Sequence, residues 1–289
     1  MTSTKSSRGT MELPLEQTVR EQIARALERD LANLDAALAL GIKLVDSSGE
    51  VNCLPGLPER TAKITMALYA KSIKTVRAIR MVSSIGLLED GRTLCRSLLE
   101  TCVAIHYLLQ KDWEVRSDEY AAYTILKDLT TAHGWRKTKG LKEDGARLEL
   151  AVKKVIAQHL LHIPPARQEV IRTTGYAGMS LEATFYEVGL SSHYQLAYRA
   201  MSSHSHATDF ATHFSWDRER GLSLHLGSTD IPEIRQLLHS TRWFFAGIME
   251  IVSKAMGLGY LAAIAKFGQE LDDPSEEVLR AWRARREEG

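Results

Sequence analysis

Apolar residues recur every three or four positions along most of this chain, and this spacing constrains the fold more than any other feature. Over residues 15–45 the recurring positions are Val19, Ile23, Leu27, Leu31, Leu34, Leu38 and Ile42. A side chain returns to the same face of an α-helix after three or four residues, so this row is typical of an amphipathic helix. Such helices bury their apolar stripes against one another. The sequence therefore predicts an all-α, multi-helix bundle.

The same pattern predicts further helices along the chain. They span about 59–84, 87–111, 116–132, 143–160, 180–188, 192–214 and 260–270. Asp230 and Pro232 have the residue types that begin a helix, and they open a long one that Gly257 interrupts. Residues 272–289 predict a charged C-terminal helix, whereas the alternation over 218–230 predicts a short strand or an extended arm. There is no internal repeat and no βαβ alternation.

The predicted organisation is one helical core with additions at both ends. Residues 1–12 are rich in small polar residues and predict a disordered lead. Residues 13–58 predict an N-terminal helix and a loop, and residues 59–230 the helical core domain. Residues 231–289 predict C-terminal helices that pack on that core.

Charge and cysteine content exclude some classes of protein. The 37 basic and 36 acidic residues give a net charge of +1, which argues against a protein that coats nucleic acid non-specifically. Cys95 and Cys102 lie seven apart on one apolar helix, where we interpret them as buried hydrophobes in a reducing compartment. The start is polar and no apolar run has spanning length, so we expect a cytoplasmic protein without a membrane partner.

Arg199 and His206 lie seven residues apart on the helix predicted over 192–214. Seven helical steps return nearly to the same face, about 10 Å further along the axis. A guanidinium and an imidazole on one face can hold a phosphodiester and transfer its protons without a metal. His204 lies away from this face, so His206 is the better candidate.

A face of hydrogen-bonding groups continues along the same predicted helix. Its members are Tyr194, Tyr198, Ser202, His206, Asp209 and His213. One interpretation is a buried polar network in which these groups satisfy one another, as is common in helical bundles. The other is that the network opens on a cleft edged by Arg199. The sequence alone leaves both interpretations open.

Arg96 and Glu100 form an i,i+4 pair on the helix predicted over 87–111. As a surface salt bridge they would contribute a few tenths of a kcal/mol. The neighbouring Arg92 and Thr93 favour a pair that faces another helix instead of bulk water. We therefore expect both side chains to point toward the tyrosine and histidine face, where Glu100 would orient His206 or Arg199.

Other functional motifs are absent or ambiguous. No phosphate-binding loop, dinucleotide fingerprint or nucleophile elbow occurs, so we expect no cofactor. His204 and His206 would be separated by about 200° on a helix and cannot share a metal there. Asp209 and His213 have the i,i+4 spacing of a chelating pair, so a metal site with His206 and Glu100 is an alternative.

The basic loop expected after residue 132 contains Trp135, Arg136, Lys137 and Lys139. A solvated loop accounts for this composition. The alternative is that the basic residues and the indole hold a polynucleotide backbone by charge and stacking.

Two segments of the chain resemble a bacterial family, the domain of unknown function 5677. They are the helix that contains RSLLE and the later Tyr194, Tyr198, Ser202, His206 series, and the resemblance covers about residues 60–230. The arginine that precedes a histidine in a helical chain is also similar to HEPN domains, many of which are metal-independent ribonucleases in toxin and phage-defence systems. This resemblance implies a HEPN-like core, catalytic roles for Arg199 and His206, and His204 as the alternative histidine.

HEPN ribonucleases usually pair two copies of the motif, so the resemblance also implies a homodimer with a composite site. They usually place a polar residue directly after the arginine, whereas this chain has Ala200.

The leading hypothesis is therefore a HEPN-like protein that binds RNA or cleaves it. In cleavage His206 would act as general acid or base and Arg199 would stabilise the developing charge, while Tyr198, Ser202 and Glu100 orient them. The alternatives are a non-catalytic scaffold or small-ligand sensor, and a metal-dependent enzyme.

Overall fold

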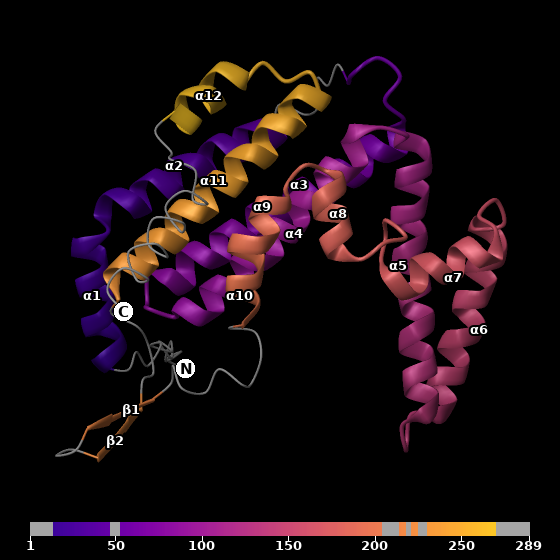
Figure 1. The fold of residues 1–289 in the computed structure, drawn as a ribbon, viewed down its shortest axis with the longest axis horizontal. Coiled ribbons are helices and arrows are strands. Elements are labelled where there is room, and N and C mark those ends of the chain that lie inside the picture. Colours follow the sequence, from indigo (N-terminus) through magenta and orange to yellow (C-terminus); the bar gives the residue numbers. More distant parts are fainter. Residues whose placement is uncertain (1–13, 47–52, 204–213, 218–220, 225–229, 270–289) are drawn as a thin grey trace, which may run out of the picture.

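The fold is a helical bundle from which a three-helix arm projects (Figure 1). The computed structural model describes residues 14–46, 53–203, 214–217, 221–224 and 230–269. The all-α prediction is confirmed, with one short β-hairpin in addition. The predicted lead over 1–12 and the predicted helix over 272–289 lie outside the described residues. Within the described part of the chain, no helix has the length and apolarity to cross a membrane.

The N-terminal segment forms two helices, α1 (Pro14–Ala26) and α2 (Glu28–Asp46), where the periodicity predicts one. The chain bends at Leu27, whose side chain is fully buried. The backbone bonds continue through the bend, because the Leu27 N–H donates to Ile23 O at 2.8 Å and Leu27 O accepts from Leu31 at 2.9 Å. An unbroken apolar row therefore gave no signal of the bend.

The bundle core forms around α11 (Ile231–Ala255), which packs against α2, α3 (Glu59–Ser83) and α4 (Leu88–Gln110). The predicted cap is confirmed, since Asp230 Oδ1 accepts from the Glu233 N–H at 3.1 Å. Gly86 lies in the turn between α3 and α4, with φ of 79°. The helix α12 (Leu261–Gln269) follows α11 and packs on it.

A close approach of α2 to α11 in this core depends on Gly41. A Cβ atom at that position would lie 2.5 Å from the Phe245 ring, and the Tyr69 hydroxyl donates to Gly41 O at 2.8 Å. Cys95 and Cys102 are buried, as expected, and burial raises the pKa of each thiol to about 12.

The arm consists of α5 (Trp113–Lys137), α6 (Lys142–His159) and α7 (Pro165–Thr174). It has a small core of its own, made by Ala122, Leu126, Leu160, Ile163 and Ile171. The predicted end of a helix at residue 132 is wrong, because α5 continues to Lys137. Arg136 on this extra turn bonds Glu149 of α6 at 2.6 Å, a contact that local sequence does not predict.

The predicted helices leave residues 161–179 without one, because consecutive prolines ordinarily stop a helix, yet α7 forms there. Pro164 is the N-cap and Pro165 the first helical residue, a position where the missing N–H has no cost.

The segment predicted as one helix over 192–214 is more complex. The helix α8 (Leu181–Glu187) precedes α9 (Ser191–His193), the π-helix η2 (Tyr194–Tyr198) and α10 (Arg199–Ser203). Residues 204–213 lie outside the described part. Phe214 already belongs to a strand, so the predicted helical end there is wrong.

Strands β1 (Phe214–Asp217) and β2 (Gly221–Leu224) pair antiparallel and form a hairpin outside the bundle (Figure 1). The strand expected within 218–230 is confirmed at β2.

Candidate functional site

Arg96, Glu100 and Tyr198 meet between α4 and the π-helix. The Tyr198 hydroxyl donates to Glu100 Oε1 at 3.0 Å and accepts from Arg96 Nη2 at 2.7 Å. Arg96 Nε also donates to Glu100 Oε1 at 3.2 Å, and the guanidinium lies 4.8 Å from the centre of the Tyr198 ring. The two charged side chains thus both contact Tyr198, although each remains partly exposed to solvent.

Tyr198 is the buried member of this cluster, with 7% of its surface exposed. Burial raises the pKa of its hydroxyl, and the neighbouring Glu100 raises it further. The phenol therefore stays protonated and acts as a fixed donor to the carboxylate. The hydrogen bonds of Tyr198 match the interpretation of the polar face as a buried network. The Glu100 side chain, however, is 39% exposed, so the network reaches solvent at this residue.

The π-helix sets the direction of the residues that follow. The Arg199 N–H bonds Tyr194 O, an i to i+5 bond that widens the turn by one residue. The Tyr194 and Tyr198 rings stack at 5.2 Å, and Phe185 of α8 packs on both. The wide turn is therefore held by packing from α8 and by the Arg96 and Glu100 contacts from α4.

Arg199 follows directly after the fixed tyrosine and lies at the surface. Its side chain is exposed, and Nη1 donates to Gln195 Oε1 at 3.2 Å. Ser202 is half-buried on α10. The cluster thus brings together Arg96, Glu100 and Tyr198, and Arg199 follows Tyr198 in the chain with its side chain bonded to Gln195.

Four predicted site residues, His204, His206, Asp209 and His213, lie outside the described residues. The placement of Arg199 relative to His206 therefore stays a prediction. So does the metal alternative, of which Glu100 is the one described ligand. Among the described residues, no three His, Cys, Asp or Glu side chains lie close enough together to hold a metal ion.

Comparison with known families assigns the region that contains this cluster to a protein family. A family model with the description "Family of unknown function (DUF5677)" matches residues 62–221, more than half of the chain. The chain belongs to this family. The resemblance predicted from the two segments is thereby confirmed. Comparison with curated proteins and with solved structures gives no match.

The DUF5677 match runs from α3 to the start of β2. It includes the Arg96, Glu100 and Tyr198 cluster, the whole arm, and the segment that contains His206. The N-terminal helices and α11 lie outside the match, although α11 packs against α3 and α4 within it.

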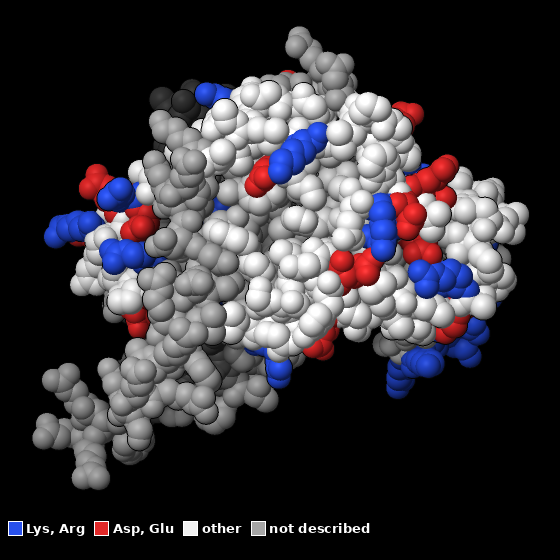
Figure 2. All heavy atoms as spheres, turned by 45° about the horizontal axis from the view of Figure 1, so that its top comes forward, with Lys and Arg blue, Asp and Glu red and all other residues white. Residues whose placement is uncertain are grey.

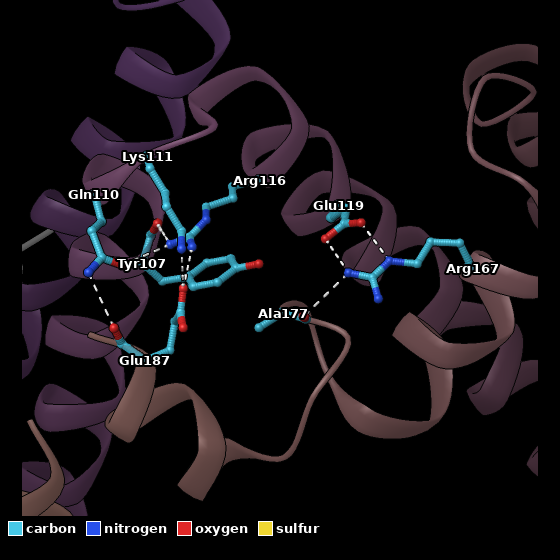
Figure 3. A network of polar contacts seen from close by, with 8 residues as sticks. All are labelled: Tyr107, Gln110, Lys111, Arg116, Glu119, Arg167, Ala177 and Glu187. Carbon is cyan, nitrogen blue, oxygen red and sulfur yellow. Dashed lines mark hydrogen bonds and ion pairs between the residues drawn. The ribbon is translucent and has the colours of Figure 1, made fainter. Parts of the chain in front are cut away.

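A second polar network within the DUF5677 region was not predicted (Figure 3). Arg116 of α5 is 5% exposed and lies 4.0 Å from the centre of the Tyr107 ring. It donates to Tyr107 O at 2.7 Å and to Glu187 Oε1 at 2.8 Å. Lys111 also pairs with Glu187, at 2.9 Å. The network therefore joins α4, α5 and α8.

A neighbouring ion pair attaches α7 to α5. Glu119 is 7% exposed and accepts from Arg167 in a two-bond pair of 2.6 and 2.8 Å, while Arg167 also donates to Ala177 O at 3.5 Å (Figure 3). The sequence does contain a signal for it. Arg116, Glu119 and Tyr123 recur at helical spacing and so lie on one face of α5. A face that packs into a core is ordinarily apolar, so charged residues on it are the signal of a buried polar contact.

Proposed function

We propose that the protein binds RNA and cleaves it without a metal ion, as a HEPN-like endoribonuclease. The observation that supports this most is the placement of Arg199. Its exposed guanidinium follows a tyrosine that Arg96 and Glu100 hold in place, so its base is fixed while its charge faces outward. A guanidinium held in this way suits a phosphate, which it binds through two parallel bonds.

In the proposed reaction the 2′-hydroxyl oxygen of one ribose attacks the adjacent phosphorus, and the bond from phosphorus to the 5′-oxygen breaks. His206 takes the 2′ proton or gives a proton to the leaving oxygen. Arg199 stabilises the charge that develops on the phosphate. Arg96, Glu100 and Tyr198 act as positioning residues for the helix that presents Arg199.

The tip of the arm supports RNA binding. Lys137 ends α5 and Lys139 lies in the turn between α5 and α6; both are exposed, and Trp135 on the last turn of α5 is 42% exposed. Figure 2 shows basic side chains gathered at the lower edge of the arm, whereas the middle of the face carries few charges. Arg136 is held by Glu149 and contributes less. A cationic tip with an exposed indole suits a single strand.

We further propose that two copies of the chain pair, so that two Arg199 and His206 sets act on one RNA. A homodimer is expected in sedimentation at the protein concentration used for cleavage.

The direct test is incubation of the purified protein with total RNA in EDTA. We expect cleavage in EDTA, with 2′,3′-cyclic phosphate ends, and no cleavage of DNA, because the nucleophile is the 2′-hydroxyl. A preparation of the His206→Ala variant from the same expression host controls for contaminating ribonuclease. Absence of cleavage with retained RNA binding would instead favour the non-catalytic scaffold.

A further inference from the structure

A cavity of about 350 Å³ is lined by residues of α3, α4 and α5. Residues of the segment 174–184 complete its lining. Its volume is at the lower end of the range of ligand pockets, about 300–1,000 Å³, which suits a small molecule and not a peptide. The side chains that line it include Glu100, Tyr120, Tyr123, Tyr176, Lys71 and Lys127.

Three tyrosines give the cavity an aromatic wall. The Tyr176 ring packs on Tyr120 at 5.0 Å and on Tyr123 at 6.2 Å. The Tyr176 hydroxyl oxygen is buried and makes no hydrogen bond in the described structure. A buried hydroxyl without a partner is costly, so native proteins seldom retain one without a ligand or water that bonds it.

Glu100 adds an acceptor to the same cavity. Both of its hydrogen bonds, from Arg96 and from Tyr198, use Oε1. Oε2 takes none within the described part of the chain. The carboxylate is therefore held by one oxygen, while the other oxygen remains available to an N–H donor on a ligand.

Two lysines supply positive charge at the same cavity. Lys71 of α3 and Lys127 of α5 both line it, both are exposed, and neither forms an ion pair among the described residues. Two unneutralised ammonium groups on the rim favour a ligand that carries a negative charge. The cavity therefore combines an aromatic wall, one hydrogen-bond acceptor, one unpaired hydroxyl and a cationic rim.

We infer that this cavity binds a single nucleotide. The planar base lies against the tyrosines and donates an N–H to Glu100, while Tyr176 bonds a polar atom of the base edge. The phosphate lies at Lys71 and Lys127. The ligand is either a free nucleoside monophosphate or one nucleotide of an RNA strand. The inference can be tested apart from RNA cleavage: Glu100 belongs to both proposals, but Arg199 does not line the cavity.

The test is calorimetric titration of the full chain with the four nucleoside monophosphates, the matching nucleosides and inorganic phosphate. We expect at least one monophosphate to bind more tightly than its nucleoside, and phosphate alone to bind least. The Lys71→Ala, Lys127→Ala double variant is expected to lose about tenfold in affinity for the monophosphate and little for the nucleoside. Lys74→Ala, an exposed lysine of the same helix that does not line the cavity, is the matched control.

Tyr176→Phe separates a ligand contact from a structural role. Removal of an unpaired buried hydroxyl is expected to raise the melting temperature of the ligand-free protein by about 2–4 °C. The same change is expected to weaken monophosphate binding by about three- to tenfold. A purely structural tyrosine would not give opposite signs for stability and binding.

Competition by an RNA tetranucleotide distinguishes a free nucleotide from a nucleotide of an RNA strand as the natural ligand. Displacement of the monophosphate by the tetranucleotide assigns the cavity to a nucleotide of RNA, and its absence assigns the cavity to a free nucleotide; either result supports the inference. It is overturned if no monophosphate binds, or if binding is unchanged in both Tyr176→Phe and the double lysine variant. Arg199→Ala is expected to lose cleavage and keep monophosphate binding, so the two proposals fail separately.

Discussion

RNA cleavage by the Arg199→Ala variant is expected to fall by about 10²–10³-fold, the cost typical of removing one group that stabilises transition-state charge. The fold should be unaffected, because this side chain is exposed and its one bond within the described structure is to Gln195. The loss should therefore appear in kcat/KM, with an unchanged melting temperature. Initial rates on one defined RNA, measured in EDTA, give the comparison.

Two further arginine variants sharpen this prediction. Arg199→Lys keeps the charge and loses the two-pronged geometry, so an intermediate rate is expected. Arg77→Ala removes an exposed arginine from α3 and is the matched control, with a rate near that of the wild type. If Arg199→Ala and Arg77→Ala cleave equally well, Arg199 has no part in the reaction.

The Arg116→Ala variant is expected to lose about 3 kcal/mol of free energy of unfolding, at the lower end of the cost of breaking a buried ion pair. The guanidinium is nearly inaccessible to solvent and holds both Tyr107 O and Glu187. Its removal leaves a cavity beside the Tyr107 ring and a carboxylate with fewer partners. Because Glu187 is 31% exposed, water compensates part of the loss.

Urea unfolding followed by circular dichroism measures the loss at Arg116. Arg147→Ala is the matched control, because this arginine on α6 is 78% exposed and its two ion pairs are long, at 3.9 Å each. The control is expected to change stability by less than about 0.5 kcal/mol. Equal stabilities for the two variants would mean that the network in Figure 3 contributes nothing to the attachment of the arm.

The sequence predicted those parts of the fold that depend on local pattern. The α3 and α4 helices follow an apolar row that needs no knowledge of the partner helix, and the Asp230 cap bonds a residue three positions away. Signals of this kind lie within one or two turns of the chain.

The parts that could not be predicted depend on contacts between distant residues. The π-helix is held by Arg96 and Glu100, about a hundred positions earlier in the chain. The local spacing of apolar residues does not contain these contacts, so it predicts an ordinary α-helix there. The last turn of α5 and the whole of α7 are likewise fixed by contacts across the arm.

In the candidate site, too, features that depend on local sequence were predictable and those that depend on distant contacts were not. The orientation of Arg96 and Glu100 toward the tyrosine face was predictable from their polar neighbours Arg92 and Thr93 on α4, and both residues contact Tyr198. The cavity beside Glu100 was not, since its lining comes from α3, α4, α5 and the segment of residues 174–184. The role of His206 rests on sequence spacing and resemblance, as the residue lies outside the described part of the chain.

The rate of RNA cleavage in EDTA by the wild-type protein and by the His206→Ala variant tests the central claim most directly. The account predicts metal-independent cleavage by the wild type and a loss of about 10²–10⁴-fold in the variant, the range for a general acid or base. His204→Ala and the exposed surface variant His159→Ala should stay near the wild-type rate. Undiminished cleavage by His206→Ala, or no cleavage by the wild type, would contradict it.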